Sequence, residues 1–258
     1  MLDFIRKRRR RRLRAAPFPD AWRGVVERNF EMFHRLPAAD RAELLGHMNV
    51  FLAEKTFEGC GGLEMTDEIR VTIAAQACLL LLHHDDPHYY PDLYTILVYP
   101  HAYVARAKEI LPGGIVVEGT SARLGESWVR GCVVLSWDDV RRGASDVADG
   151  HNVVLHEFAH QLDQEDGTSD GAPILDRRSQ YVAWARVLGD EFEKLRRSAE
   201  RGTRTDIDTY GATNAAEFFA VVTEAFFERP RSLHKRHPEL YEELAMFYKQ
   251  DPLAGYAR

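Results

Sequence analysis

The chain of 258 residues is long enough to bury a substantial core, and its 45% hydrophobic and 29% charged residues are typical of a soluble globular protein. The longest apolar run, Ile73–Leu82, is too short to span a bilayer, which excludes a transmembrane helix. The cysteines are scattered and indicate neither a disulfide framework nor a cysteine-based metal site: Cys60, Cys78 and Cys132. We therefore expect a protein of a reducing compartment, the cytoplasm.

Positive charge is concentrated at the N-terminus. Residues 1–14 carry a net charge of +7, which leaves −13 on the other 244 residues because the whole chain carries −6. No apolar segment follows Arg6–Arg12, so this run is not a secretory signal. Such a run could touch nucleic acid or an acidic lipid surface, but it is more often solvated. We predict a basic, disordered arm over residues 1–19 and one compact unit over residues 20–258.

The first part of that unit, to about residue 90, is predicted to be helical, and a small sheet follows it. Three stretches have the hydrophobic spacing of helices: Asp20–Leu36, Asp40–Lys55 and Thr66–Leu82. Thr66 is a suitable N-cap for the last of these, and Phe57–Leu63 is a loop or a short strand. β-Branched and aromatic residues then predict three strands: Leu93–Tyr99, Gly114–Glu118 and Gly131–Trp137.

The rest of the chain is again predicted to be helical. A helix at Val153–Asp163 is expected to be capped by Asp146 or Asp149 and to stop before Gly167, at the start of a polar loop over Asp166–Pro173. Three more helices are expected: Tyr181–Arg197, Asn214–Arg229 and His237–Lys249. This order of elements predicts an α+β fold that is mostly helical, with a small mixed sheet.

The helix at Val153–Asp163 contains the pattern His-Glu-x-x-His. His156 and His160 lie one helical turn apart on the same face, so both rings can reach one metal ion. Glu157 lies beside them, where its carboxylate can act as a general base toward a water molecule. The pattern is that of zinc-dependent peptidases and predicts a site for one Zn²⁺ ion per chain.

A catalytic zinc site usually has a third protein ligand. No third histidine follows shortly after His160, so we expect a carboxylate from the apolar helix at 214–229, where burial would require a partner for its charge. The candidates are Glu217, Glu224 and Glu228. Asn214 and Glu217 also have the spacing of a capping box. From the residue pattern alone, helix capping and metal binding explain Glu217 equally well. Glu224 is a weaker candidate than Glu217 for the third ligand.

Two further groups have competing interpretations. Asp163 lies on the ligand face of its helix, where it could hold a ligand imidazole, or cap the helix end and bind Arg177 or Arg178. The cluster at His83–His88 has the composition of a metal site, but its Asp-Pro step favours a polar loop.

Several segments resemble known zinc peptidases. Tyr210–Ala220 resembles the second zinc-site segment of anthrax lethal factor, and His156–His160 resembles its first. From about Trp22 to Leu253 the sequence resembles the Mlc titration factor A family of bacterial cytosolic zinc peptidases, and the arginine-rich arm lies outside this resemblance. The segments that carry it are Ile96–Pro100, Gly125–Trp128, Val133–Trp137, His156–Asp163 and Phe247–Leu253.

The resemblance implies a zincin-like catalytic domain of the gluzincin type. Its zinc ligands would be His156, His160 and Glu217, with Glu157 as the general base. Tyr210 would be an active-site residue that donates to the oxyanion, although the residues alone favour a tyrosine packed where a helix begins. The resemblance also implies aminopeptidase-like cleavage of short peptides and an association with a transcriptional repressor of sugar uptake.

Two functions of other classes are open alternatives. The protein could sequester a regulator and use zinc mainly as a structural ion, but the intact Glu157 argues against this because a structural site needs no base. The basic run could bind nucleic acid or a membrane, at most as an accessory role, since the remainder of the chain is acidic. We expect no specific nucleic-acid binding.

Overall fold

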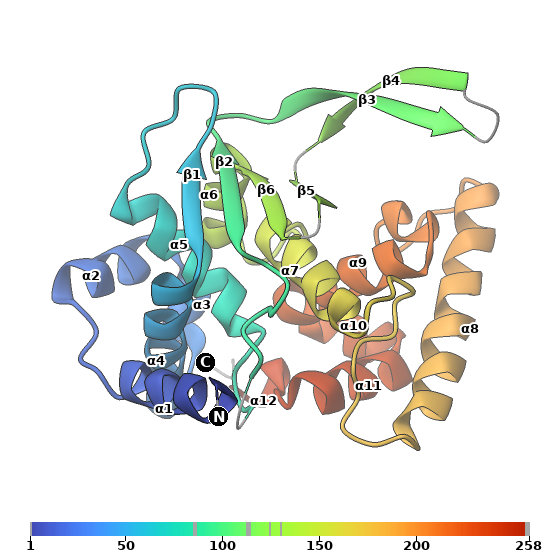
Figure 1. Cartoon of the computed structure of the whole chain (residues 1–258). Helices are drawn as coiled ribbons and strands as arrows, with labels where there is room; N and C mark the ends of the chain where they lie inside the picture. The colour runs from blue at the N-terminus through green and yellow to red at the C-terminus, as the bar shows by residue number, and fades with distance from the viewer. Residues whose placement is uncertain (1, 85–86, 112–114, 124, 130, 256–258) are drawn as a thin grey trace.

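The computed structural model describes residues 2–84, 87–111, 115–123, 125–129 and 131–255, and for residues 103–129 it describes the backbone alone (Figure 1). The buried hydrophobic residues form one cluster that extends from the N-terminal to the C-terminal helices. None of the described helices combines the length and the hydrophobicity that a membrane crossing requires.

The N-terminal part consists of helices, as predicted. They are α1 (Leu2–Arg14), α2 (Asp20–Asn29), α3 (Glu31–Arg35), α4 (Ala38–Glu54) and α5 (Asp67–Leu79). Thr66 caps α5 by accepting a hydrogen bond from the Ile69 N–H, which confirms the predicted cap. The single helix expected over Asp20–Leu36 is wrong, because Phe30 takes an extended conformation (φ −117°, ψ 92°) that ends α2 and buries its ring.

The predicted disordered arm is also wrong. Residues 2–14 form α1, which packs against α4, and Arg10 is only 8% exposed. The Arg10 guanidinium forms a bidentate pair with the Glu54 carboxylate, at 3.0 Å for Nε–Oε1 and 2.7 Å for Nη2–Oε2, and lies 4.8 Å from the centre of the Tyr89 ring. Leu13 packs against the core one turn later. These partners come from distant parts of the chain, so the charge run alone does not reveal them.

A small mixed sheet lies between the two helical parts, as predicted. Its order is β1 (Thr56–Gly59), β2 (Thr95–Tyr99), β6 (Cys132–Ser136) and β5 (Gly125–Val129). The first three strands are parallel, and β5 pairs antiparallel with β6 at one edge. The strands β3 (Tyr103–Leu111) and β4 (Ile115–Arg123) form a separate antiparallel hairpin that projects from the body (Figure 1). The sequence predicted β2, β6 and the start of β4, but it missed β3 and β5, whose residues form no apolar run.

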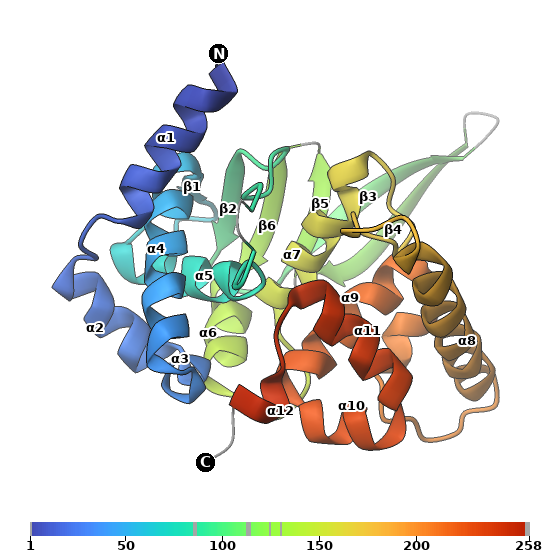
Figure 2. The same cartoon turned by 90° about the horizontal axis from the view of Figure 1, so that it is seen from below.

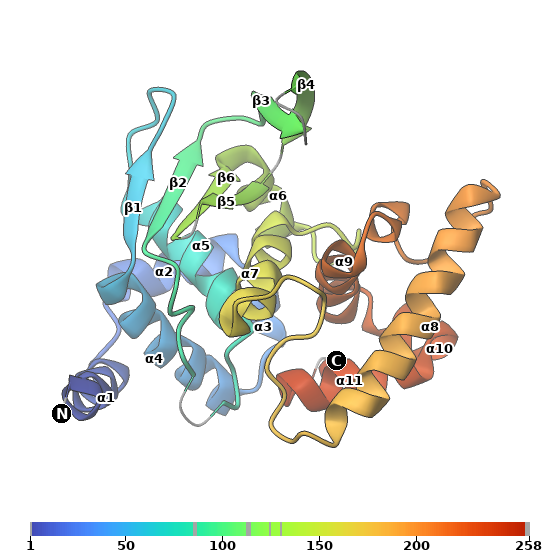
Figure 3. The same ribbon diagram turned by 45° about the vertical axis from the view of Figure 1, so that its right-hand side comes forward.

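The C-terminal part begins with α6 (Trp137–Ser145) and α7 (Val153–Asp163), and a short 3-10 helix, η1 (Gln164–Asp166), ends at Gly167 with a positive φ of 91°. The remaining elements are α8 (Gln180–Glu200), the 3-10 helix η2 (Thr209–Ala212), α9 (Ala215–Glu228), α10 (Pro230–Arg236), α11 (Pro238–Tyr248) and α12 (Pro252–Gly255). The one helix expected over His237–Lys249 is α11. In Figure 3, α7 lies between the sheet and α9, and both of these elements contact it.

Candidate metal centre

The helix α7 is fixed at its start by a buried asparagine. Asn152 is fully buried, and its Oδ1 accepts hydrogen bonds from the backbone N–H groups of Val154 (3.1 Å) and Leu155 (3.0 Å). Its Nδ2 donates to the Gly143 carbonyl at 3.0 Å, which ties the cap to α6. The predicted caps Asp146 and Asp149 are wrong: each accepts from a backbone N–H two residues later in the loop before the helix.

The opposite wall of the site is the first turn of α9. Asn214 caps this helix by accepting a hydrogen bond from the Glu217 N–H at 2.9 Å. The Glu217 carboxylate extends toward α7, where its Oε2 lies 3.0 Å from His156 Nε2 and 3.5 Å from His160 Nε2. Glu217 thus contributes its backbone to the cap and its side chain to the site.

Three donor atoms meet between α7 and α9. His156 Nε2 and His160 Nε2 lie 3.2 Å apart, and Glu217 Oε2 completes the triangle. Bonds of about 2.0–2.2 Å to a tetrahedral zinc ion require ligand atoms about 3.3–3.6 Å apart, and the three observed separations are close to this value. Throughout the described residues, these side chains form the one group of three or more potential ligands. The donor set therefore fits a divalent cation of the zinc type.

The electrostatics of the site also favour a cation. Burial lowers the pKa of His156, but hydrogen bonds with the carboxylates of Glu217 and Glu224 outweigh it and raise this pKa to about 10. Positive charge is therefore stabilised at this ring, and a divalent cation can supply that charge in place of a proton.

Glu224 lies behind the His156 ring. Its Oε1 accepts from His156 Nδ1 at 2.8 Å, and its Oε2 accepts from the Asn152 N–H. With Nδ1 protonated toward Glu224, the Nε2 lone pair faces Glu217 and the other donor atoms. The sequence had suggested Glu224 as a possible ligand, and the structure places it on the Nδ1 side of His156, outside the group of three converging donor atoms.

Glu228, the third carboxylate of α9, lies one turn further from the donor atoms. Its Oε2 accepts from the Gly150 N–H at 3.0 Å, and Oε1 has no hydrogen-bond partner among the described residues. Burial raises its pKa to about 9, so this side chain is a neutral acid at pH 7.

Glu224→Gln should lower the zinc affinity by about 10- to 100-fold, the usual effect of removing a partner that orients a ligand histidine. The glutamine amide has a single acceptor oxygen, whereas the carboxylate accepts hydrogen bonds from two donors, His156 Nδ1 and the Asn152 N–H. Competition with a chelator of known affinity measures the change. Glu228→Gln is the matched control on the same helix, and it should keep the wild-type affinity because Glu228 is already uncharged. Equal affinities for both variants would contradict the orienting role.

Glu157 lies beside the donor side chains as a buried carboxylate. It is 4% exposed, and its Oε2 has no hydrogen-bond partner among the residues that the structure describes. Burial raises its pKa to about 6. A carboxylate with a free oxygen and a raised pKa next to the donor atoms is suited to take up a proton.

Tyr210 lies outside the two helices beside the donor side chains, and Asp163 is the last residue of α7. Tyr210 lies in η2, its ring is 6.0 Å from that of His156, and 55% of its surface is exposed, which argues against a tyrosine packed where a helix begins. Asp163 is fully buried at the end of α7, where its Oδ2 accepts from the Gly171 N–H at 3.0 Å and burial raises its pKa to about 6.

The Gly171 loop connects both halves of the site. Gly171 has a φ of +78°, and a Cβ at this position would lie 2.4 Å from the Ala215 carbonyl oxygen at the start of α9. The Trp184 Nε1–H donates to the Gly171 carbonyl at 2.9 Å. Asp163 therefore holds the end of α7 to a loop that is packed on α9, and among the described contacts it forms no ion pair with Arg177 or Arg178.

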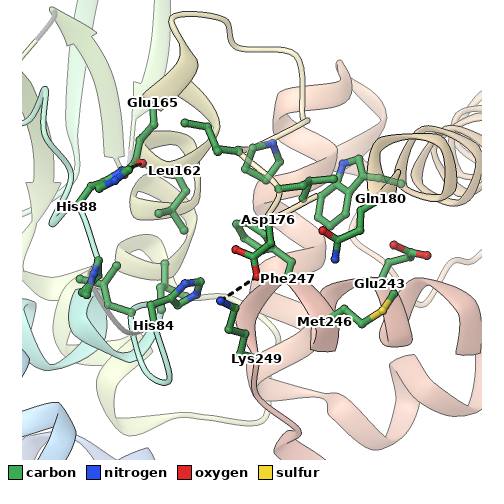
Figure 4. Close-up of a pocket in the computed structure, with 17 residues that line it drawn as sticks. His84, His88, Leu162, Glu165, Asp176, Gln180, Glu243, Met246, Phe247 and Lys249 are labelled. Carbon is green, nitrogen blue, oxygen red and sulfur yellow. Dashed lines mark hydrogen bonds and ion pairs between the residues drawn. The ribbon is translucent and has the colours of Figure 1, made fainter. Parts of the chain in front are cut away.

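A separate pocket of about 260 Å³ lies on another side of α7 (Figure 4). Leu162, Glu165, Trp184 and Phe247 are among the residues that line it, and none of the three donor side chains does. Figure 4 shows the Asp176–Lys249 pair within it, 2.9 Å apart.

The predicted polar loop at His83–His88 borders this pocket. His84 and His88 line it, and His88 pairs with Glu165 at 3.1 Å. Residues 85 and 86 lie outside the described residues. Among the described residues, this loop supplies no group of three potential ligands.

Comparison with known proteins assigns the chain to a family. The family model of the glucose-regulated metallo-peptidase M90 matches residues 4–249. The chain is 41% identical over 247 residues to an uncharacterized protein of a Synechocystis strain, covering 95% of this chain and 89% of that protein. It is 30% identical over 233 residues to the proteins called Mlc titration factor A of Yersinia pestis and Yersinia pseudotuberculosis, covering 89% of this chain and 85% of each of theirs. The family match begins within α1, so this helix is part of the resemblance and not outside it.

Proposed function

The chain belongs to the glucose-regulated metallopeptidase family M90, and from this premise we propose that it is a zinc-dependent peptidase whose ligands are His156, His160 and Glu217. The observation that carries the proposal is the convergence of two imidazole nitrogens and one carboxylate oxygen, 3.0–3.5 Å apart, beside the buried Glu157. The HExxH helix α7 and the Glu-bearing helix α9 would make this a zincin-like site of the gluzincin type.

The chemistry that zinc supplies when bound is that of a Lewis acid, which lowers the pKa of water and polarises a carbonyl group. The protein's own residues handle the protons. Glu157 accepts the proton of the attacking water at its free carboxylate oxygen and delivers it to the leaving amine. Tyr210, beside the His156 ring, donates a hydrogen bond from its hydroxyl group to the oxyanion that develops on the substrate. Glu224 keeps the His156 ring in the orientation that exposes Nε2.

We propose aminopeptidase-like cleavage of short peptides as the activity, as the family resemblance implies. The relatives named Mlc titration factor A suggest in addition a transcriptional repressor of the Mlc type as a protein partner. A cytoplasmic location is consistent with such a partner and stays a prediction from the sequence.

A peptide-library digest tests the substrate class. The zinc-loaded protein should release N-terminal residues from short peptides, and mass spectrometry identifies the cleaved bonds. The same sample treated with a chelator should be inactive and should recover when zinc is restored. Cleavage inside long peptides would contradict the aminopeptidase assignment, and no cleavage by the zinc-loaded protein would favour a sequestering function.

A further inference from the structure

The helix α1 presents two different faces. Arg10 and Leu13 lie against the body, and the Arg14 Nη2 is 3.8 Å from a Glu43 carboxylate oxygen. At 100° per residue, the exposed side chains on the other side share an arc of about 120°. They are Phe4, Ile5, Arg8, Arg11 and Arg12.

The outer face, defined as these five residues, combines free positive charge with exposed apolar surface. The guanidinium groups of Arg8, Arg11 and Arg12 have no ion-pair or hydrogen-bond partner among the described residues, although the chain beyond residue 14 carries an excess of 13 negative charges. Phe4 is 65% exposed and Ile5 is 57% exposed, which places both among the most exposed large hydrophobic residues. Folding therefore leaves both kinds of side chain available to a partner.

The position of α1 lets this face meet a flat surface. Figure 2 shows the N-terminal half of α1 extending beyond α4 at the edge of the molecule. In all three ribbon views α1 lies far from α7 and α9, so a surface bound to α1 leaves the metal centre open to substrate.

We propose that the outer face of α1 binds an anionic lipid surface. Arginine pairs with lipid phosphate groups through its planar, two-pronged donor geometry. A helix with basic side chains and a few large apolar ones lies in the headgroup region, where the apolar side chains leave water. Phe4 and Ile5 decide between lipid and nucleic acid, since a duplex offers phosphates but no apolar layer for these two side chains. The acidic remainder of the chain is repelled by the same surface, which favours contact through α1 alone.

Co-sedimentation of the full-length protein with vesicles tests the proposal. The protein should bind vesicles of phosphatidylglycerol and phosphatidylcholine at least tenfold more tightly than vesicles of phosphatidylcholine alone. The variant Arg8→Glu/Arg11→Glu/Arg12→Glu should lose this preference. The variant Phe4→Ser/Ile5→Ser keeps every charge. It should nevertheless bind the anionic vesicles at least several-fold more weakly than the wild type does, because it has lost the two apolar side chains. Circular dichroism establishes that each variant is folded.

A matched control changes the same amount of charge elsewhere. Arg197, Arg201 and Arg204 are exposed near the end of α8, and Arg197→Glu/Arg201→Glu/Arg204→Glu should bind the vesicles as wild type does. Equal loss in both triple variants would show that net charge alone acts and would overturn the proposal. Wild-type binding by the folded α1 triple variant would also overturn it. A third result would overturn it: the wild type binds duplex DNA more tightly than the vesicles, the α1 triple variant loses this DNA binding, and Phe4→Ser/Ile5→Ser keeps it.

Discussion

Glu157→Gln should lower kcat/KM for peptide hydrolysis by about 10²- to 10⁴-fold while the protein keeps its zinc, because a general base contributes a factor of this size. The amide has nearly the shape of the carboxylate but cannot accept the proton of water. Glu157 is not one of the three converging donors, so its replacement leaves the ligands in place. Hydrolysis of a chromogenic amino-acid amide gives the rate, and inductively coupled plasma mass spectrometry gives the zinc content.

Glu165→Gln is the matched control for this prediction. Glu165 follows α7, lines the separate pocket and pairs with His88, so its replacement should leave hydrolysis unchanged. If Glu157→Gln were as active as the wild type, Glu157 would not be the base and the proposed mechanism would be wrong.

The second large effect is expected at Glu217. Glu217→Ala removes one of three donors and should lower the zinc affinity by more than about 100-fold, since removing a partner behind a ligand already costs about 10- to 100-fold. The helix itself should persist, because its cap uses the backbone N–H of residue 217 and alanine favours helix. Chelator competition measures the affinity, and hydrolysis at limiting zinc should fall with it.

Comparison of Glu217→Ala with Glu224→Gln identifies the third ligand. The structure predicts the larger loss for Glu217, whose Oε2 lies 3.0 Å from His156 Nε2, whereas Glu224 contacts His156 Nδ1. Full retention of zinc by Glu217→Ala, together with its loss in Glu224→Gln, would transfer the ligand role to Glu224.

Much of the fold could be predicted because its signals are local. The spacing of apolar residues predicted α4, α5, α8 and α9, and Thr66 marked the start of α5. The two histidines of α7 are also a local pattern, since four residues separate them on one helix. For such features the backbone period already determines which side chains share a face.

The missed features depend on contacts between distant segments. The helix α1 is held by Arg10 and Glu54, 44 residues apart, in a run whose charges resemble those of a solvated arm. The cap of α7 is an exception, because Asn152 directly precedes Val153 and accepts from N–H groups two and three residues later, so it is a local feature that the sequence could have predicted. Glu217 faces Nε2 of His156 and Glu224 faces Nδ1. The sequence does not show which nitrogen each carboxylate faces, so it could not distinguish the positions of the two residues. The family resemblance singled out Glu217, and the geometry places Glu224 at the other nitrogen of His156.

The most direct test is an anomalous difference map, recorded at the zinc absorption edge, from crystals of the protein purified with zinc. We predict one strong peak per chain between α7 and α9, about 2.0–2.2 Å from His156 Nε2, His160 Nε2 and a carboxylate oxygen of Glu217. A map without a peak at this position at saturating zinc, or with its peak at other ligands, would contradict the proposed metal centre.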